Sequence, residues 1–510
     1  MIEYNVKPSF RQKLVLAIPF TSPAFIAAFG VLLITVIALF TAPYIGMADN
    51  GDFFRITYSN GLYFNQPDYD SQYFGYFIKQ FGIFQYYNEN QAILNSSQSL
   101  FIKLAIGLNK LLYSDKVFDV RFQAAMYTIL YVCAIYILIE SITWKMSRKQ
   151  GLLIAAIAIF IFGDTAYTAF FNSFFGESVV TIMMIFVFGS WLALYRKRYN
   201  DYAMLALLLT STVILTTSKQ QNAPVGMIIS VLAITLIWIR KDTLFRWLTM
   251  GSVILMMFTG VATYLNISKE FVDINQYHAM TRGVLNQSSN PEDTLKSFGI
   301  DEQYAILKGT IYYEQYGTID VKSPILEKEF YSRYGFVPIL KYYASNPGQL
   351  NAILNVAAKS AFTIRPPAMG NYEKTVGKEY GAHTRFFSGY SLLKEKLAPR
   401  TFGFVVIWVL LILGLYMPSC IAAVKEGNLR GIQRMALVLA TMGVGVSGIL
   451  VSIIGAGDAD LSKHEFLFTL SFDLVTFLAV SNVIGRSIFK DVQRNTTGGY
   501  NPEVQKGVGA

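Results

Sequence analysis

The sequence predicts an all-α polytopic membrane protein, and its composition and hydropathy carry that prediction. Of the 510 residues, 53% are hydrophobic and only 15% are charged, and the mean hydropathy is +0.39. Apolar runs of roughly 16 to 25 residues recur along the chain, which is the length that an α-helix needs to cross a bilayer. The net charge of +10 lies largely in short clusters between these runs. Membrane topology explains such clusters, so we expect no nucleic acid among the partners.

About ten apolar runs qualify as transmembrane helices by this length. The first follows Lys7, Arg11 and Lys13 and lacks a small-residue cleavage pattern, so we expect a retained anchor rather than a removed signal peptide. The runs fall near residues 24–44, 123–144, 150–163, 178–195, 202–217, 223–239, 244–265, 401–423, 435–456 and 466–485.

Basic clusters orient these helices in the bilayer. The positive-inside rule places clustered Lys and Arg in the cytoplasm, together with both termini. The remaining connections are then extracytoplasmic, including two long ones at 45–122 and 266–400. Loops of this length without their own structure are uncommon, so we expect both to be folded. Every second connection carries a cluster, at 145–149, 196–198, 240–246, 425–434 and 486–494.

The spans divide the chain into four parts. Within the two long loops, residues 98–113 and 346–362 carry apolar side chains near helical spacing and predict surface helices. The tail is Gly-rich and polar, and we expect it to be disordered. The parts are an N-terminal transmembrane module (1–265) that includes the loop at 45–122, a large extracytoplasmic segment (266–400), C-terminal transmembrane helices (401–485) and a cytoplasmic tail (486–510).

Two acids, Asp49 and Asp52, follow the first span within GMADNGDFF. They are three residues apart and share a face if the chain continues as a helical turn. Carboxylates at a membrane–water boundary can act as a general base or bind a divalent cation. The alternative is an ordinary turn, because Asp, Asn and Gly are common turn residues.

A second acidic stretch, at 163–178, contains Asp164, Asn172 and Glu177 in an aromatic-rich turn that we expect on the external side. Polar groups in such an apolar setting are costly unless they are paired, hydrated or functional. Asp164 and Glu177 either cap the neighbouring helices or supply a carboxylate to a metal or acid–base site shared with the first loop.

Cationic side chains stand at two further external helix ends. Lys219, in TTSKQQNAP, joins two short spans, and irregular backbone at such a place is typical of a site, although a snorkelling lysine is equally compatible. Lys463 and His464 open the last helix, where free N–H groups and the helix dipole suit a phosphate.

Several other classes of chemistry are not indicated. Cys133 and Cys420 both lie within apolar runs, so no disulfide framework is predicted. The sequence contains no His/Cys metal motif, no P-loop and no dinucleotide fingerprint. We therefore do not expect ATP-driven chemistry in this chain.

Six stretches distributed from the first helix to the last resemble one family. Together they resemble the GT-C superfamily of integral-membrane glycosyltransferases, and within it the bacterial hexosyltransferases of S-layer and related wall polymers. Glu465 departs from the pattern, since an apolar residue is expected there. The stretches are ADNGDFFR (48–55), FDVRFQAAMY (118–127), YTAFFNSFFGES (167–178), SFGIDEQYAILKG (297–309), IRPPAMGNYEK (364–374) and KHEFLF (463–468).

The resemblance implies a GT-C-like fold and an inverting hexosyl transfer. The donor would be a polyprenyl-phosphate-linked sugar and the acceptor a surface glycan or wall polymer, on the extracytoplasmic face of a bacterial cell membrane. An aspartate of the first external loop would act as base, which singles out Asp52 and Asp49. We prefer Asp52, because it opens an aromatic stretch that could floor a sugar site.

The resemblance also requires cations for the departing phosphate, because negative charge develops there. We expect Arg365, Lys219, Lys463 and His464 to supply them. Arg365 lies in IRPP, where two prolines stiffen the chain, and Arg can hold phosphate bidentately; a surface arginine is the alternative. Glu177 and Asp49 would bind Mg or Mn only if the reaction uses a divalent cation, and no other cofactor is expected.

Other classes of function remain open at the level of sequence. A lipid-linked sugar flippase or transporter would line a pathway with intramembrane charges, and Asp473 in the last helix is such a charge. The two halves of the chain show no inverted repeat of the kind that transporters often carry. A polymerase or ligase that moves whole glycan chains shares the lipid-phosphate chemistry and is not separated by these residues.

Overall fold

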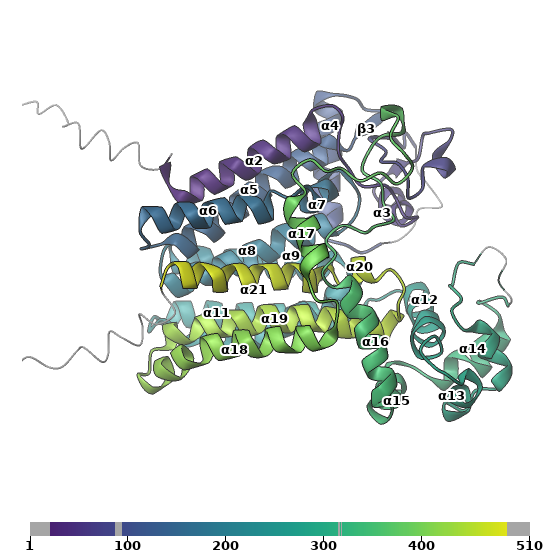
Figure 1. Cartoon of the computed structure of the whole chain (residues 1–510). Helices are drawn as coiled ribbons and strands as arrows, with labels where there is room; N and C mark the ends of the chain where they lie inside the picture. The colour runs from purple at the N-terminus through teal and green to yellow at the C-terminus, as the bar shows by residue number, and fades with distance from the viewer. Residues whose placement is uncertain (1–20, 87–93, 315–316, 318, 487–510) are drawn as a thin grey trace, which may run out of the picture.

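The computed structural model describes residues 21–86, 94–314, 317 and 319–486 (Figure 1). Long helices lie side by side in a bundle, and both long loops fold at one end of it, which we call the loop face. The predicted tail lies outside the described residues beyond residue 486, as do Lys7, Arg11 and Lys13.

Within the described residues, nine helical segments are long and apolar enough to cross a membrane. A tenth span arises if α6 (Arg148–Phe162) is joined to the bent segment Thr165–Asn172. This number confirms a multi-pass membrane protein with about ten spans. The nine are α2 (Pro23–Phe40), α5 (Arg121–Thr143), α8 (Glu177–Arg196), α9 (Asp201–Ser218), Gln220–Trp238 with α10 (Ala223–Ala233) at its centre, α11 (Thr243–Leu265), α18 (Phe402–Lys425), α19 (Leu429–Ala456) and α21 (Phe466–Ile484).

The third predicted span differs most from its expectation. Helix α6 ends at Phe162, and the chain bends by 50° into α7 (Thr165–Thr168) and the 3-10 turn η3 (Ala169–Asn172). The turn at 163–178, which was predicted on the external side, lies at the loop face. It is not exposed there, because residues 161–194 are buried throughout. Its aromatic rings pack inward instead of facing water, since Phe171 lies 5.3 Å from Tyr131 between ring centres.

Local capping explains where several helices begin at the end opposite the loop face. Ser147 and Gln150 form a capping box at the start of α6. The side chains of Asn200 and Asp242 accept backbone N–H groups at the starts of α9 and α11. The basic clusters at 145–149, 196–198 and 240–246 lie in these same connections, and the cluster at 425–434 lies between α18 and α19 at the same end of the bundle (Figure 1). Beyond Arg486, the last cluster lies outside the described residues.

The first long loop contains a small sheet that the sequence does not predict. Three short antiparallel strands pair in the order β1 (Leu62–Tyr63), β2 (Gln80–Ile83) and β3 (Val117–Asp119). The sheet packs beside α3 (Phe53–Ser59) and α4 (Gln98–Leu112). Helix α4 confirms the first predicted surface helix.

The second long loop carries the remaining surface helices. In Figure 1, α16 and α17 run across the ends of the bundle helices rather than along them. Helix α16 confirms the second predicted surface helix. The helices are α12 (Lys269–His278), α13 (Pro291–Ser297), α14 (Pro324–Glu329), α15 (Phe336–Ser345), α16 (Pro347–Ser360) and α17 (Gly389–Leu397), with a π-helical turn at Ala279–Val284.

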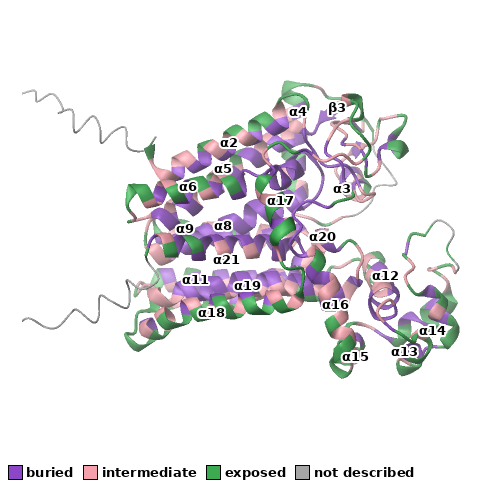
Figure 2. Ribbon diagram, viewed as in Figure 1, coloured by how far each residue is buried: buried purple, intermediate pink, exposed green. Residues whose placement is uncertain are grey.

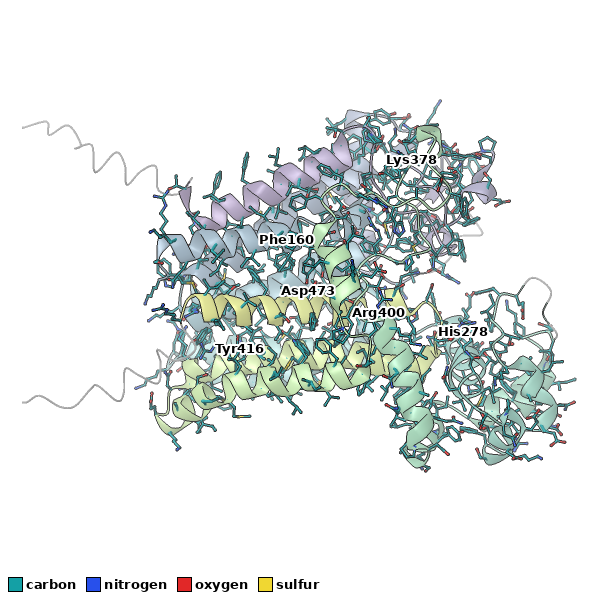
Figure 3. The ribbon with its side chains drawn as sticks, viewed as in Figure 1. Phe160, His278, Lys378, Arg400, Tyr416 and Asp473 are labelled. Atoms are coloured by element: carbon teal, nitrogen blue, oxygen red, sulfur yellow. The ribbon has the colours of Figure 1, made fainter. Side chains whose placement is uncertain are left out.

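Helix α17 exposes leucines on one side and anchors into the bundle on the other (Figure 2). Its Lys394 Nζ lies 2.6 Å from Oδ1 of Asp473 in α21, and the two side chains are 4% and 0% exposed. Tyr390 OH donates to the same oxygen at 2.6 Å, and Tyr167 OH donates to Oδ2 at 2.5 Å. Figure 3 places Asp473 on α21 where α17 crosses it. The intramembrane acid noted in the sequence is therefore fully partnered.

Candidate functional site at the loop face

Asp52 lies at the start of α3, directly after the extended segment that leaves the first helix. Its side chain does not cap that helix. Instead, Oδ2 accepts a hydrogen bond from Lys463 Nζ, and Oδ1 lies 3.1 Å from Nη1 of Arg55. The Asp52 side chain is 45% exposed, so a carboxylate held by two cations faces the loop-face surface.

These two cations set the protonation state of Asp52. Partial desolvation opposes ionisation, but the Lys463 ammonium and the Arg55 guanidinium outweigh it and hold the pKa of Asp52 well below its ordinary value. Asp52 is therefore ionised at neutral pH, which a general base requires. The same cations also lower its affinity for a proton.

Asp49 has a different environment from Asp52. Its Oδ1 accepts the backbone N–H groups of Gly51, Asp52 and Phe53 at 2.8, 3.0 and 3.1 Å. Its Oδ2 accepts the hydroxyl of Tyr69. Burial raises the pKa of Asp49 although these hydrogen bonds oppose the shift. The carboxylate of Asp49 thus shapes the turn that presents Asp52.

Lys463 belongs to the short helix α20 (Leu461–His464), which precedes the last span. Its side chain is only 7% exposed, and its Nζ also lies 3.5 Å from Oδ2 of Asp460. The ammonium stands 4.8 Å from the centre of the Phe175 ring. Burial lowers the pKa of Lys463, but the surrounding carboxylates outweigh this effect and raise it. The lysine is therefore a permanent, well-enclosed cation.

Glu177 and Lys219, which the sequence analysis treated separately, form an ion pair. Lys219 Nζ lies 2.6 Å from Oε1 of Glu177, whose side chain is 1% exposed. The other oxygen, Oε2, is buried without a hydrogen-bond partner. A β-carbon at Gly176 would lie 3.0 Å from Cγ of Lys219, so a larger residue there would require the lysine side chain to shift by a few tenths of an ångström.

His464 lies close to both the Asp52–Lys463 pair and the Glu177–Lys219 pair, because charges from both shift its pKa. Burial lowers the pKa of His464 to about 4, Asp460 and Asp52 oppose that shift, and Lys219 and Lys463 add to it. The imidazole is therefore neutral at pH 7. We call Asp52, Glu177, Lys219, Asp460, Lys463 and His464 the loop-face cluster.

Arg365 is not brought into the loop-face cluster by any contact that the structure shows among the described residues. Its Nη1 donates to Oδ1 of Asn371 at 2.8 Å, and its Nη2 donates to the carbonyl of Thr384 at 3.2 Å. Asn371 in turn donates to the carbonyl of Gly46 at 2.8 Å. Arg365 thus holds the 364–384 segment against the first loop.

Arg55 is a site residue to which the sequence analysis gave no role. Its side chain is 12% exposed and stacks on Phe54 and Phe271, with the guanidinium carbon 4.6 and 5.1 Å from the ring centres. Nη2 donates to the Tyr313 hydroxyl at 3.3 Å. The only sequence signal was an arginine three residues after Asp52, because Phe271 and Tyr313 come from the second long loop.

A metal site is not evident among the described residues, where no group of three or more His, Cys, Asp or Glu side chains is arranged to hold an ion. Asp49 is occupied by backbone N–H groups and Tyr69, whereas Glu177 keeps one oxygen unpartnered. Binding of a divalent cation by these residues stays a prediction.

Comparisons with known proteins identify the family. The family described as the YfdI N-terminal transmembrane domain matches residues 8–503. The chain belongs to this family. No curated protein matches it. Among solved structures, it is similar to the archaeal oligosaccharyltransferase AglB from Archaeoglobus fulgidus, solved with an inhibitory peptide and a dolichol-phosphate, at 11% identity and a TM-score of 0.36. That match covers 97% of this chain and 53% of AglB, so the chain spans about half of AglB's length.

A surface cavity of about 390 Å³ lies in the second long loop. It is joined to Asp52 through side chains, because Tyr313 OH donates to Oε1 of Glu270 at 2.7 Å and also meets Arg55. The lining residues are Lys269, Glu270, Asp273, Tyr312, Val321, Lys322, Glu327 and Tyr331.

The loop-face cluster combines two chemical capacities. The half-exposed carboxylate of Asp52 can accept a proton from a hydroxyl group. The enclosed ammonium of Lys463 and the partly exposed ammonium of Lys219 can neutralise an anion, and such an effect is strongest where water is excluded. Since the two capacities meet at one point, the cluster suits a transfer reaction with an anionic leaving group.

Proposed function

We propose that the protein is a GT-C-type glycosyltransferase that uses a polyprenyl-phosphate sugar and moves a hexose onto a cell-surface glycan or wall polymer. The observation that carries the proposal is the contact between the half-exposed carboxylate of Asp52 and the enclosed ammonium of Lys463. The basic clusters at the opposite end of the bundle support an extracytoplasmic loop face in a bacterial cell membrane, with cytoplasmic termini.

In the proposed reaction, an acceptor hydroxyl oxygen bonds to C1 of the hexose while the bond between C1 and the phosphate oxygen breaks. Asp52 takes the hydroxyl proton, and the bonding electrons leave with polyprenyl phosphate, so the configuration at C1 inverts. Asp52 is preferred to Asp49 because the Asp49 carboxylate already accepts three backbone N–H groups and the Tyr69 hydroxyl.

The leaving phosphate is assigned to the cationic side of the cluster. Lys463 and Lys219 supply charge, and neutral His464 supplies a hydrogen bond. Arg365 would have to exchange its contacts with Asn371 and Thr384 to join them. If a divalent cation takes part, Glu177 is the better ligand, because one of its oxygens has no hydrogen-bond partner.

The acceptor is assigned to the surface cavity in the second long loop. Its tyrosine rings can stack on sugar faces, and its carboxylates can accept hydrogen bonds from hydroxyl groups. The chain of contacts from Glu270 through Tyr313 and Arg55 to Asp52 supports an acceptor that reaches the base from this side.

A lipid-linked sugar flippase or transporter is the second candidate. The ion pair of Lys394 and Asp473 favours it, since charges near transmembrane helices often line a transport pathway. Both residues are, however, buried, Asp473 also accepts the hydroxyls of Tyr167 and Tyr390, and Lys394 also donates to the carbonyl of Thr469, which is typical of a structural anchor.

The test uses purified protein in lipid nanodiscs with radiolabelled polyprenyl-phosphate hexoses and candidate acceptors. We expect consumption of the donor, release of polyprenyl phosphate and loss of both in Asp52→Asn. Asp70→Asn is the matched control, because Asp70 is an exposed acid of the same loop. Movement of the lipid-linked sugar across the bilayer, without release of polyprenyl phosphate, would establish the flippase instead.

A further inference from the structure

The Lys463 ammonium, which would bind the donor phosphate, already contacts carboxylates of the protein. Lys463 Nζ contacts Asp52 Oδ2, lies 3.5 Å from Asp460 Oδ2 and faces the ring of Phe175 at 4.8 Å. A phosphate that approaches Lys463 therefore competes with carboxylates for the ammonium group.

The exposed fractions of the side chains show which carboxylate can move away from its lysine. Lys463 is 7% exposed, whereas Asp52 is 45% exposed, so the acid is on the open side of this pair. The neighbouring pair has the opposite arrangement, with Lys219 at 21% and Glu177 at 1%. Glu177 cannot turn away into solvent, but the Asp52 carboxylate can turn toward the surface. The exchangeable contact is thus the one between Asp52 and Lys463.

Arg55 would keep Asp52 in place after such an exchange. Its Nη1 lies 3.1 Å from Asp52 Oδ1, the oxygen that does not contact Lys463. The guanidinium is fixed between Phe54 and Phe271 and bonded to Tyr313. The carboxylate therefore loses one cation and keeps the other, so it stays in the site and gains affinity for a proton.

On the basis of the proposed function, we propose that Asp52 and the donor phosphate compete for Lys463, so that donor binding releases the base. Before the donor binds, Asp52 satisfies the buried ammonium and is a weak base. When the lipid phosphate takes the ammonium, Asp52 turns toward the acceptor side and becomes a stronger base. The donor consequently binds before the acceptor hydroxyl is activated, and water is not activated in the absence of the donor.

A binding assay tests the competition between Asp52 and the donor phosphate for Lys463. Removing the charge of Asp52 should tighten phosphate binding although it abolishes transfer. We expect Asp52→Asn in nanodiscs to bind a short-chain polyprenyl phosphate roughly tenfold more tightly than the wild type, because one charge-assisted contact no longer competes. Asp460→Asn should give a smaller gain, since Asp460 lies farther from Lys463. Asp70→Asn, an exposed acid of the same loop, should bind as the wild type does.

The controls separate this inference from the proposed function. The uncharged polyprenol should bind all variants equally, because the competition concerns only the phosphate. If Asp52→Asn does not fold, Asp52→Ser gives the same readout. Equal or weaker binding of polyprenyl phosphate by a folded Asp52 variant overturns the competition alone. No binding by the wild type or any variant overturns the proposed function and the competition with it.

Discussion

Lys463 Nζ hydrogen-bonds to Asp52 Oδ2, although the two residues are 411 positions apart in the sequence. The contact joins the loop after the first transmembrane helix to the turn before the last one. Asn50 reinforces it, because its Nδ2 donates to Oδ2 of Asp460 at 2.9 Å. The loop after the first helix and the turn before the last helix thus meet at the loop face and build one cluster.

Asp52→Asn should abolish transfer without loss of the fold. The amide keeps the shape of the carboxylate but cannot take a proton, so we expect the transfer rate to fall by about 10²- to 10⁴-fold. The measurement is release of polyprenyl phosphate at saturating donor, compared with Asp70→Asn. Near-normal release by a folded Asp52→Asn protein would exclude Asp52 as the base.

Asp49 should prove to be a structural residue. Asp49→Ala removes the acceptor of three backbone N–H groups and should lower the free energy of unfolding by about 1–3 kcal/mol. Asp49→Asn keeps an acceptor oxygen and should retain both stability and transfer. Thermal unfolding and release of polyprenyl phosphate check the two variants together. A folded but inactive Asp49→Asn protein would instead assign the base to Asp49.

Hydropathy predicts the helices well because it is a local property. The runs that became α5, α11 and α18 are apolar enough to be placed from sequence alone. The bend after α6 was missed because its aromatic residues resemble those of a membrane interface, whereas here they fill the interior. The sheet was missed because β1 contains only two residues.

The candidate site was predicted residue by residue but not as an arrangement. The sequence predicts site roles for Asp52, Lys463, Glu177 and Lys219, but their pairing depends on how distant helices pack. Nothing in the sequence indicates that Arg55 would stack on side chains of the second long loop. Local pattern therefore selects charged groups near helix ends, and tertiary packing decides which of them meet.

The ion pair of Lys394 and Asp473 should anchor α17. Lys394→Met leaves the buried Asp473 carboxylate without its cation and should cost about 3–5 kcal/mol of unfolding free energy. The double variant Lys394→Met with Asp473→Leu should recover part of this loss, because no buried charge remains. Lys396→Met, at an exposed position of the same helix, should change stability by less than about 0.5 kcal/mol. Thermal unfolding in detergent checks all three, and equal losses in Lys394→Met and Lys396→Met would contradict an anchoring role.

His464 should make the protein less stable as the pH falls. Its pKa is about 4 in the folded protein, against an ordinary value of 6.5, chiefly because of burial. Between these two pH values the unfolded chain binds more protons than the folded protein, so the free energy of unfolding decreases from pH 6.5 to pH 4. One such histidine contributes at most about 1.4 kcal/mol per pH unit.

His464→Gln removes this contribution, so its stability should decline less between pH 6.5 and pH 4 than that of the wild type. His383→Gln should show a similar change, because burial also lowers the pKa of His383 to about 4 at a separate position. Comparison of each variant with the wild type cancels the carboxyl groups that titrate in the same range. Chemical unfolding followed at several pH values gives these differences, and parallel pH profiles for the wild type and His464→Gln would show that His464 is protonated equally in the folded and unfolded states.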